Sequence, residues 1–348
     1  MPPRLNPFES KGRWFKGSLH CHTTNSDGIL PPVDVARAYA ENGYDFVVFT
    51  DHGKVTSLAE DNGGVLPVGG EELSVGRSKA GESYHVIAIG IEGELRAEGG
   101  DGPESVQEVV DDIADSGGLA FIAHPYWSGL VPEDMVCVKG YLGIEVFNTG
   151  CEAEVGKGFS IVHWDQVLSL GRMVKGVAVD DAHRYLYPPY DAFGGWVWVR
   201  ADELEWGCVA KAIGKGLFYS SMGPKITLVE LGKTLRVKCS GAKQVSMISH
   251  NGSGMVFDYP TVKSIVERRK RGEKDDGAIS SVDFEYVDGG MEAEITLRNG
   301  RKLRGMSSNE GIIEAECDLG FFNRYVRIEV VDKENRKAWT NPLPLGAE

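Results

Sequence analysis

The sequence has no long apolar run and no paired-cysteine motif. None of its apolar segments approaches the roughly 18 residues that a bilayer-spanning helix needs. The first residues, Met1 to Asn6, lack the apolar stretch of an export signal. The six cysteines are scattered and form no Cys-x-x-Cys pair, so a disulfide framework is not expected in a chain of 348 residues. We therefore expect a reduced, cytoplasmic protein that does not enter a membrane.

Positive charge is also scarce. The 37 lysines and arginines are outnumbered by 51 aspartates and glutamates, which gives a formal net charge of -14. An acidic surface argues against a general binder of nucleic acid or of anionic membranes. It does not exclude an anionic substrate, because bound metal ions reverse the local field. With 42% hydrophobic and 25% charged residues, the composition is that of a globular protein with one large or two medium domains.

From residue 14 to about residue 222, short β-rich runs alternate with helical patterns. One example is a helix that Pro32 opens and Gly43 closes, followed by the apolar strand Phe46 to Phe49. Such alternation predicts a parallel sheet with helical crossovers. About seven repeats favour closure into a barrel, and an open doubly wound sheet is the alternative.

After Gly223-Pro224 the pattern changes to strands without intervening helices. This change predicts a first domain over residues 1–222 and a small β-sandwich over residues 223–348. The exception is a basic segment near 262–272, which we expect to form an inserted helix followed by a mobile loop at 274–277. We interpret its positive charge as a solvated face rather than a binding patch.

The most informative stretch is residues 16–28, which contains the pair His20 and His22. Residues two apart in a strand point to the same face, so both imidazoles would reach one point in space. The turn that follows carries an acid, Asp27. Two imidazoles and a carboxylate are a metal-ligand set. Taken alone, the pair is equally compatible with two half-buried structural histidines.

Six of the eight histidines lie at the boundaries of strands expected in the first domain, and acids accompany them. The histidines are His20, His22, His52, His85, His124 and His183, and the acids are Asp27, Asp51, Glu72, Glu145 and Asp181. Several of these histidines directly follow the apolar run of a strand. In a barrel those strand ends converge on the face where active sites are built. The ordered set therefore predicts a polynuclear metal site.

The ordered set resembles the motifs of the polymerase and histidinol phosphatase (PHP) family of metal-dependent hydrolases. The matching segments are residues 19–28, 50–53, 70–74 with 84–86, 123–125 and 181–183, within a resemblance that covers residues 14 to 222. The segment Ala338 to Pro342 resembles the end of a two-domain branch that includes carbaryl-cleaving hydrolases. The resemblance implies a distorted (β/α)7, TIM-like barrel that binds two or three divalent ions, which would be Zn, Mn or Fe.

The resemblance also implies a ligand set for each ion. The first ion would be bound by His20, His22, Glu72 and Asp181, the second by Glu72, His85 and His124, and the third by Asp27, His52 and His183. Strand alternation lets only one of Glu71 and Glu72 point inward, and the family pattern favours Glu72. Asp51 is expected to orient His52 rather than to bind metal. Cys21 should face the other side of its strand and pack there.

The activity implied is hydrolysis of a small phosphomonoester or phosphodiester by a metal-bridged hydroxide, which Glu72 and Asp181 would hold in place. A carboxyl or carbamate ester or amide hydrolase on the same metals is the alternative, and a non-catalytic, metal-stabilised binding protein is the second. Arg184, Glu145 and Asn148 are candidate contacts to a small anionic substrate. The tyrosines of residues 185–190 are interpreted as a covering loop. No polymerase domain is attached, no membrane partner is expected, and the oligomeric state stays open.

Overall fold

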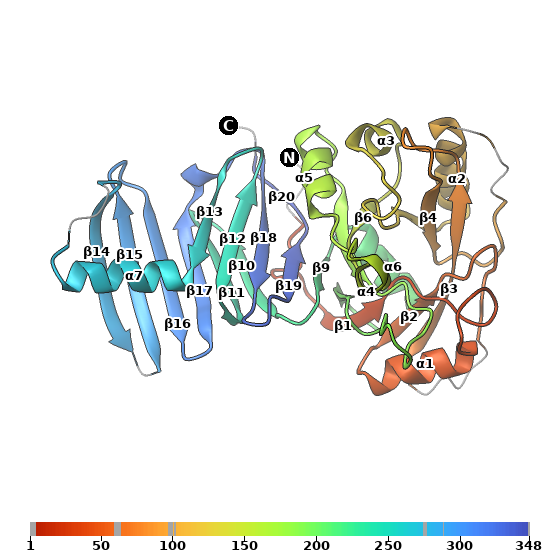
Figure 1. Cartoon of the computed structure of the whole chain (residues 1–348), viewed down its shortest axis with the longest axis horizontal. Helices are drawn as coiled ribbons and strands as arrows, with labels where there is room; N and C mark the ends of the chain where they lie inside the picture. The colour runs from red at the N-terminus through yellow and green to blue at the C-terminus, as the bar shows by residue number, and fades with distance from the viewer. Residues whose placement is uncertain are drawn as a thin grey trace. The chain divides into compact units, whose positions relative to one another are not determined.

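The computed structural model describes residues 5–58, 64–96, 100, 102–273, 277–287 and 289–346. They form two compact units (Figure 1), one from Lys11 to Ser220 and one from Ser221 onward that also includes residues 5–10. The prediction had placed residues 1–10 in the first domain. The structure places residues 5–10 in the second unit, where the buried Asn6 side chain donates to the Val229 carbonyl at 2.7 Å. Among the described residues no helix is long and apolar enough to cross a membrane.

Among the described residues, the strands of the first unit follow one another in the hydrogen-bonded order β9-β8-β1-β2-β3-β4-β5-β6-β7. Their bounds are β1 Arg13–Ser18, β2 Phe46–Phe49, β3 Leu66–Val75, β4 Tyr84–Ile89, β5 Leu119–Ile122, β6 Gly143–Asn148, β7 Lys175–Val179, β8 Trp196–Ala201 and β9 Phe218–Ser221. The first and last strands of this order, β9 and β7, meet at Ser220. Its hydroxyl accepts from the Ala178 N–H at 3.1 Å and donates to the Gly176 carbonyl at 2.8 Å, both on β7. A side chain thus closes the predicted distorted barrel.

The sheet is mixed, whereas the alternating pattern predicted a parallel one. Strands β1, β2 and β3 are parallel, as are β5, β6 and β7, but β4 is antiparallel to both β3 and β5. A parallel return needs a crossover of at least about 10 to 12 residues. The connection over residues 76–83 is too short for one. Because β4 runs backwards, His85 at its start lies at the same barrel end as the last residues of β3.

Helices pack against this sheet and fix its apolar core. They are α1 Pro32–Glu41, α2 Pro103–Asp115, α3 Pro132–Cys137, α4 Thr149–Val155, α5 Ile161–Ser169 and α6 Trp206–Gly214. Three of them begin with proline, whose fixed φ suits the first helical turn. The barrel core is built around apolar side chains such as Phe46, Phe121 and Val177. The polar residues that follow each strand therefore emerge at the barrel end.

The second unit is built from two antiparallel sheets. The first sheet has the order β10-β11-β17-β16-β15-β14, and its strands are β10 Ile226–Leu231, β11 Thr234–Ala242, β14 Ile279–Val287, β15 Gly290–Leu297, β16 Lys302–Ser308 and β17 Gly311–Asp318. The second contains β12 Gln244–Ser249, β13 Gly254–Asp258, β18 Tyr325–Val331, β19 Lys337–Thr340 and β20 Leu343–Pro344. Cys317 of β17 contacts Met247 of β12 at 3.3 Å between sulfurs, so the two sheets touch at this point. The β-sandwich expected for residues 223–348 stays a prediction.

The inserted helix is α7, Tyr259–Lys270, which begins and ends slightly before the predicted range of 262–272. Figure 1 shows α7 lying across the six-stranded sheet, and its Val266 packs with Met291 and Ala293 of β15. The Asp258 side chain caps its first turn by accepting from the Thr261 N–H at 2.9 Å. Most of the loop predicted at 274–277 lies outside the described residues.

Candidate metal centre

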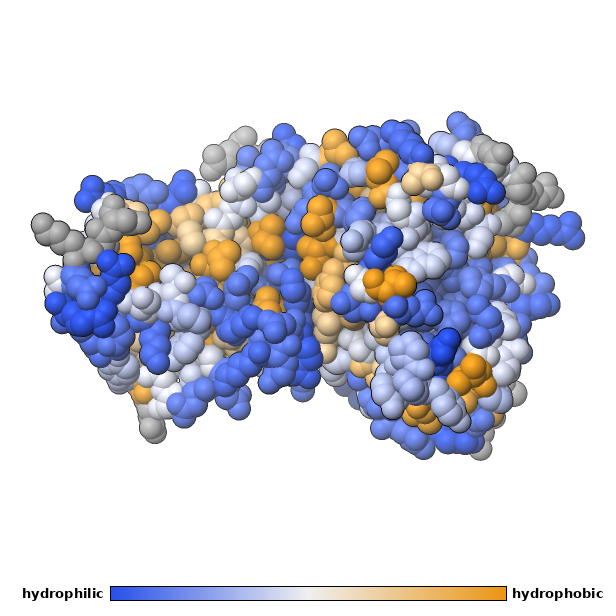
Figure 2. Space-filling model, viewed as in Figure 1, coloured by the Kyte–Doolittle hydropathy of each residue, from blue (hydrophilic) through white to orange (hydrophobic). Residues whose placement is uncertain are grey.

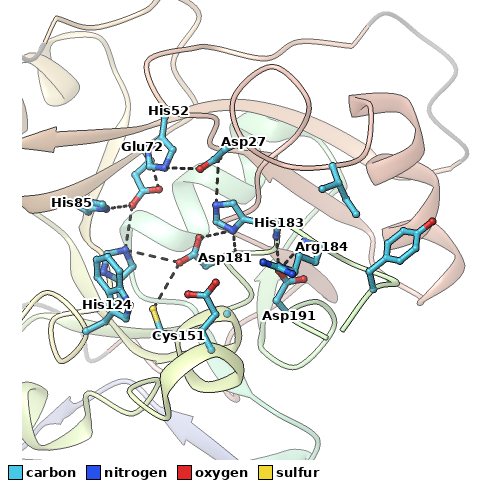
Figure 3. A pocket seen from close by; sticks show the side chains of 15 residues that line it. Asp27, His52, Glu72, His85, His124, Cys151, Asp181, His183, Arg184 and Asp191 are labelled. Carbon is cyan, nitrogen blue, oxygen red and sulfur yellow. Dashed lines mark hydrogen bonds and ion pairs between the residues drawn. The ribbon is translucent and has the colours of Figure 1, made fainter. Parts of the chain in front are cut away.

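The nine side chains that the sequence suggested as metal ligands come together at one end of the barrel. They are His20, His22, Asp27, His52, Glu72, His85, His124, Asp181 and His183. Figure 3 shows those that line the cavity, such as Glu72, His124 and Asp181. The nine side chains fall into three groups, and within each group the ligand atoms all lie within 4.8 Å of one another. The structure thus brings together residues that are up to 163 positions apart in the chain, as a shared site at the strand ends requires.

The first group is buried and compact. His20 Nε2 and His22 Nε2 lie 3.1 Å apart. Each of these nitrogens lies 3.1 to 3.2 Å from both Glu72 Oε2 and Asp181 Oδ1. Four ligands around a Zn²⁺ ion at about 2.0 to 2.1 Å would be roughly 3.3 Å from one another. The donor types and their spacing therefore fit one four-coordinate divalent cation.

Glu72 connects the first group to the second. Its Oε2 faces the histidines of the first group, while its Oε1 lies 2.7 Å from His85 Nδ1 and 3.2 Å from His124 Nε2. A carboxylate with each oxygen directed at a different set of imidazoles is placed to bridge two cations. Asp181 Oδ2 lies 4.0 Å from His124 Nε2, so Asp181 is the other carboxylate between the two groups.

The third group is looser and more open. Asp27 Oδ1 lies 3.5 Å from His183 Nε2, and Asp27 Oδ2 lies 3.7 Å from His52 Nε2. The Asp27 side chain is 55% exposed, in contrast to the buried first group. His22 also borders this group, since its Nδ1 lies 3.5 Å from Asp27 Oδ1. A cation here would be held less rigidly than one in the first group.

Glu145 and Asn148, which we expected to contact substrate, lie beneath the ligands and outside the pocket lining. Glu145 Oε1 is 2.6 Å from His20 Nδ1, and Oε2 accepts from the His124 N–H at 2.8 Å. Asn148 donates to Glu145 Oε2 at 2.9 Å and to Asp181 Oδ2 at 3.1 Å. With a carboxylate at its Nδ1, the His20 ring donates there and leaves Nε2 free as a ligand. Both residues lie on β6, Asn148 at its end and Glu145 three residues earlier.

Asp51 also has a different role from the one expected. Its carboxylate accepts from the backbone N–H of Thr23 at 2.7 Å, from the Thr23 hydroxyl at 2.8 Å and from the Ser26 hydroxyl at 2.7 Å. These bonds fix the turn that carries Asp27. The His52 ring instead faces the carboxylates of Asp27 and Glu72. Asp51 and His52 are adjacent, so their side chains leave the chain in different directions.

Two neighbours of the ligands, Glu71 and Cys21, point away from the site. Glu71 accepts from the Leu95 N–H at 2.9 Å, and burial raises the pKa of its carboxyl group. Cys21 packs in an apolar cluster, as expected, with its sulfur 3.3 Å from the Val48 carbonyl. Of the pair Glu71 and Glu72, only Glu72 is directed at the histidines.

Two ligands have unfavourable backbone conformations. His124 has φ of 23° and Asp181 has φ of 56°, in the left-handed region that non-glycine residues rarely adopt. Such strain persists where surrounding contacts over-determine it, and it is concentrated at functional sites. Here the Glu145 carboxylate holds the His124 N–H, and the His20 carbonyl accepts from the Asp181 N–H at 2.9 Å.

The electrostatics of the buried ligands call for positive charge. Burial disfavours the charged form of His22, but hydrogen bonds and charges from Asp181 and Glu72 outweigh it and raise its pKa to about 9. Burial alone would raise the pKa of Glu72, yet the nearby imidazoles hold it well below its usual range. The carboxylates therefore retain their charge, which protons on the imidazoles or metal cations can balance.

A cavity of about 660 Å³ opens onto the ligands. Arg184 supplies the positively charged side chain among the lining residues. It is exposed and directly follows His183 in the chain. Sequence reasoning missed Trp127 and Ile29, which also line the cavity. Trp127 follows His124 by three residues, and that spacing within a tight turn is the signal that could have found it. Of the tyrosines interpreted as a covering loop, Tyr187 lines the cavity.

Known proteins match this chain in part or over nearly its whole length. No family model matches the chain. A stretch of 81 residues is 31% identical to a 5'-3' exoribonuclease of Haemophilus influenzae, and it covers 22% of this chain and 29% of that protein. An amidohydrolase from Chromobacterium violaceum, solved with sulfate and no metal, covers 48% of this chain and 87% of its own, with 18% identity and a TM-score of 0.39 too low to carry an argument.

The full length of the chain superposes on one solved structure. That structure is a two-domain protein from Bacteroides vulgatus described as containing a predicted PHP-like metal-dependent phosphoesterase. The match covers 99% of this chain and 98% of that one, with a TM-score of 0.50 and 15% identity, which establishes the fold. This chain therefore has the two-domain fold of a PHP-like protein, with clusters of histidines and acids at the end of its barrel.

Proposed function

We propose that the protein is a metal-dependent phosphoesterase that cleaves small phosphomonoesters or phosphodiesters. The observation that carries this proposal is the Glu72 carboxylate, which faces two histidines with each of its oxygens. This arrangement suits two adjacent divalent ions, and the Asp27 group offers a place for a third. Nitrogen and oxygen donors without thiolates suit Zn, Mn or Fe.

Divalent ions held at these groups would supply Lewis acidity to phosphoryl oxygens and would lower the pKa of water from 15.7 toward roughly 7. Residues of the chain hold the ligands in fixed positions. Glu72 and Asp181 keep the first two groups adjacent, and Glu145 fixes the ring of His20. Asp51 fixes the turn that positions Asp27. Rigid placement of this kind reduces the reorganisation that a reaction in water requires.

The charge balance of the pocket favours an anionic substrate. Two or three divalent ions would offset the ligand carboxylates of Asp27, Glu72 and Asp181 and place positive charge directly at the ligand groups, while Glu154 and Asp191 add negative charge elsewhere in the lining. Arg184 adds a further positive charge at the wall, and no acidic partner of its guanidinium occurs among the described residues. We propose that Arg184 contacts the phosphate. A neutral carboxyl or carbamate ester would not use this positive field.

The test is a comparison of substrate classes on one preparation. The full chain is stripped with a chelator and reloaded with Mn²⁺, Zn²⁺ or Fe²⁺. Release of phosphate from a panel of phosphomonoesters and phosphodiesters is measured beside hydrolysis of 1-naphthyl acetate and a 1-naphthyl carbamate. We expect metal-dependent turnover of phosphate esters. Turnover of the naphthyl esters alone would identify the carboxyl or carbamate hydrolase instead, and a loaded protein that cleaves nothing would favour a binding role.

We also propose that the protein works in a reducing compartment, the cytoplasm. All six of its cysteines are free, and four are buried. Burial raises the pKa of the Cys239 and Cys317 thiols to about 12, so these groups stay protonated and unreactive. Thiol titration of the protein purified without reductant should find these buried cysteines reduced.

A further inference from the structure

We propose that the pocket selects a phosphate ester whose alcohol is flat and apolar, and that Trp127 is the residue that contacts this group. The inference rests on the proposed phosphoesterase function and names its substrate class. It follows from apolar side chains that line the metal pocket but remain exposed.

Three large apolar residues line the cavity without being buried in it. Trp127 is 40% exposed, Ile29 is 45% exposed and Tyr187 is 60% exposed. The face drawn in Figure 2 is mostly hydrophilic, with apolar side chains in separate patches. These apolar side chains are exposed to water beside the metal ligands. Packing an apolar group of a ligand against them would remove apolar surface from water, which favours binding. A small hydrophilic alcohol would leave this surface wet.

Trp127 lies directly beside the second ligand group. Its ring centroid is 5.0 Å from that of His124 and 5.9 Å from that of His85. Both histidines face Glu72 Oε1. A phosphate held at this group would therefore place its alcohol within reach of the indole face. Aromatic surfaces at such distances pair in stacked or edge-to-face arrangements.

The position of Trp127 is fixed by the backbone rather than by the ligands. The Ser128 N–H donates to the His124 carbonyl at 3.1 Å, and the Leu130 N–H donates to the Pro125 carbonyl at 2.9 Å. His124 in turn is held by the Ser128 hydroxyl, 3.0 Å from its Nδ1, and by a carboxylate on its backbone N–H. Removing the indole would leave both sets of contacts in place, so Trp127 can be altered without losing the ligand.

Ile29 and Tyr187 form a second apolar wall beside the third ligand group. The Ile29 N–H donates to the His183 carbonyl at 2.9 Å, and the Tyr187 N–H donates to the Arg184 carbonyl at 3.1 Å. The cavity thus has metal ligands at its base, an indole beside the second group, and Ile29, Tyr187 and Arg184 beside the third, with the acids Glu154 and Asp191 also in its lining. A volume of about 660 Å³ is ample for a phosphate and a two-ring alcohol.

Two esters of primary alcohols separate this proposal from leaving-group chemistry. They are 2-naphthylmethyl phosphate and 2-methylpropyl phosphate, whose alcohols leave with similar difficulty. For the Mn²⁺-loaded protein we expect kcat/KM to be higher for the naphthylmethyl ester. Trp127→Ala should lower that value about tenfold, mainly through KM, and should change the methylpropyl ester less than about twofold. Trp127→Phe should keep most of the preference.

Tyr126→Ala is the matched control. Tyr126 is the preceding residue and is 43% exposed, but it does not line the cavity. Its substitution should leave the preference unchanged. An equal effect of Tyr126→Ala and Trp127→Ala, an equal loss on both esters, or a wild-type protein without preference would each overturn the proposal.

A binding measurement separates this inference from the proposed function. Calorimetry with the nonhydrolysable 2-naphthylmethyl phosphonate and 2-methylpropyl phosphonate needs no turnover. Tighter binding of the naphthylmethyl compound that Trp127→Ala removes would support the apolar subsite even if no phosphate ester is cleaved, in which case the phosphoesterase proposal alone fails. Equal binding of the two phosphonates would reject the subsite even in an active phosphoesterase.

Discussion

The barrel end of the first unit and the six-stranded sheet of the second unit place their charged side chains in opposite ways. In the first unit, acids and histidines such as His20, Glu72 and Glu145 are buried and converge on a few points. In the second unit, oppositely charged residues face each other across strands on the exposed side of the six-stranded sheet. Examples are Lys302 with Glu294 at 2.6 Å and Lys238 with Glu314 at 3.3 Å.

Buried charges at the candidate metal centre and exposed ion pairs on the six-stranded sheet differ in what they contribute to stability. Removing a charge from water costs several kcal/mol, and good partners recover that cost only in part. Exposed pairs contribute typically 0 to 1 kcal/mol and are screened by salt. The buried set therefore lowers the stability of the barrel unless it binds cations, whereas the exposed pairs of the second unit cost and contribute little.

The largest effect should follow from removing the carboxylate that joins the two groups. Glu72→Gln keeps the size of the side chain but removes the charge that cations would need. We expect kcat to fall by at least about 10³-fold and the protein to lose bound metal. Glu71→Gln is the matched control, because Glu71 is adjacent and buried but points to the Leu95 N–H. Comparable metal loss in both variants would contradict the assignment.

A smaller effect is expected from Glu145→Gln, which changes a residue beneath the ligands. The amide can still contact His20 and His124 but no longer holds a full charge against the His20 Nδ1–H. We expect metal affinity to fall about 10- to 100-fold, with kcat largely retained at saturating metal. Competition with a fluorescent chelator measures the affinity. Loss of kcat at full metal occupancy would show that Glu145 acts in the reaction itself.

The pH dependence of metal binding should distinguish the buried site from an exposed one. The pKa of His22 is raised from 6.5 to about 9 in the folded chain, so in the metal-free protein its contribution to stability is present below pH 6.5 and disappears as pH rises through 9. A metal ion must displace this proton at neutral pH. We therefore expect metal affinity to increase from pH 6.5 to 9, with proton release on binding. Calorimetry in buffers of different ionisation enthalpy counts the protons, and no release at pH 7.5 would contradict the charge balance.

The smallest effect should come from the exposed pairs of the second unit. Lys302→Ala removes the partner of Glu294; the Lys302 side chain is 57% exposed and the Glu294 side chain 35%. We expect the free energy of unfolding to change by less than about 1 kcal/mol, with metal content and kcat unchanged. Urea denaturation in low and high salt measures the change. A larger loss would mean that these charges are more than a solvated surface.

Much of the site could be predicted from sequence because its ligands lie at or near strand ends, where the local residue pattern indicates which way each side chain points. His20 and His22 follow from two-residue spacing in a strand, and His124 from the apolar run before it. The antiparallel course of β4 could not be read from alternation, although the short connection before it contained that information. Contacts between distant segments were inaccessible. Thus Glu145 was assigned to the pocket although it holds His20, and Asp51 was assigned to His52 although it holds the turn before Asp27.

The central claim is that cations occupy the space between the buried imidazoles and carboxylates. Crystals of the metal-loaded protein, measured at the absorption edge of the added ion, test it directly. The account predicts anomalous peaks on both sides of Glu72, one among His20, His22 and Asp181 and one beside His85 and His124. Anomalous density confined to other parts of the molecule, with none beside Glu72, would contradict it.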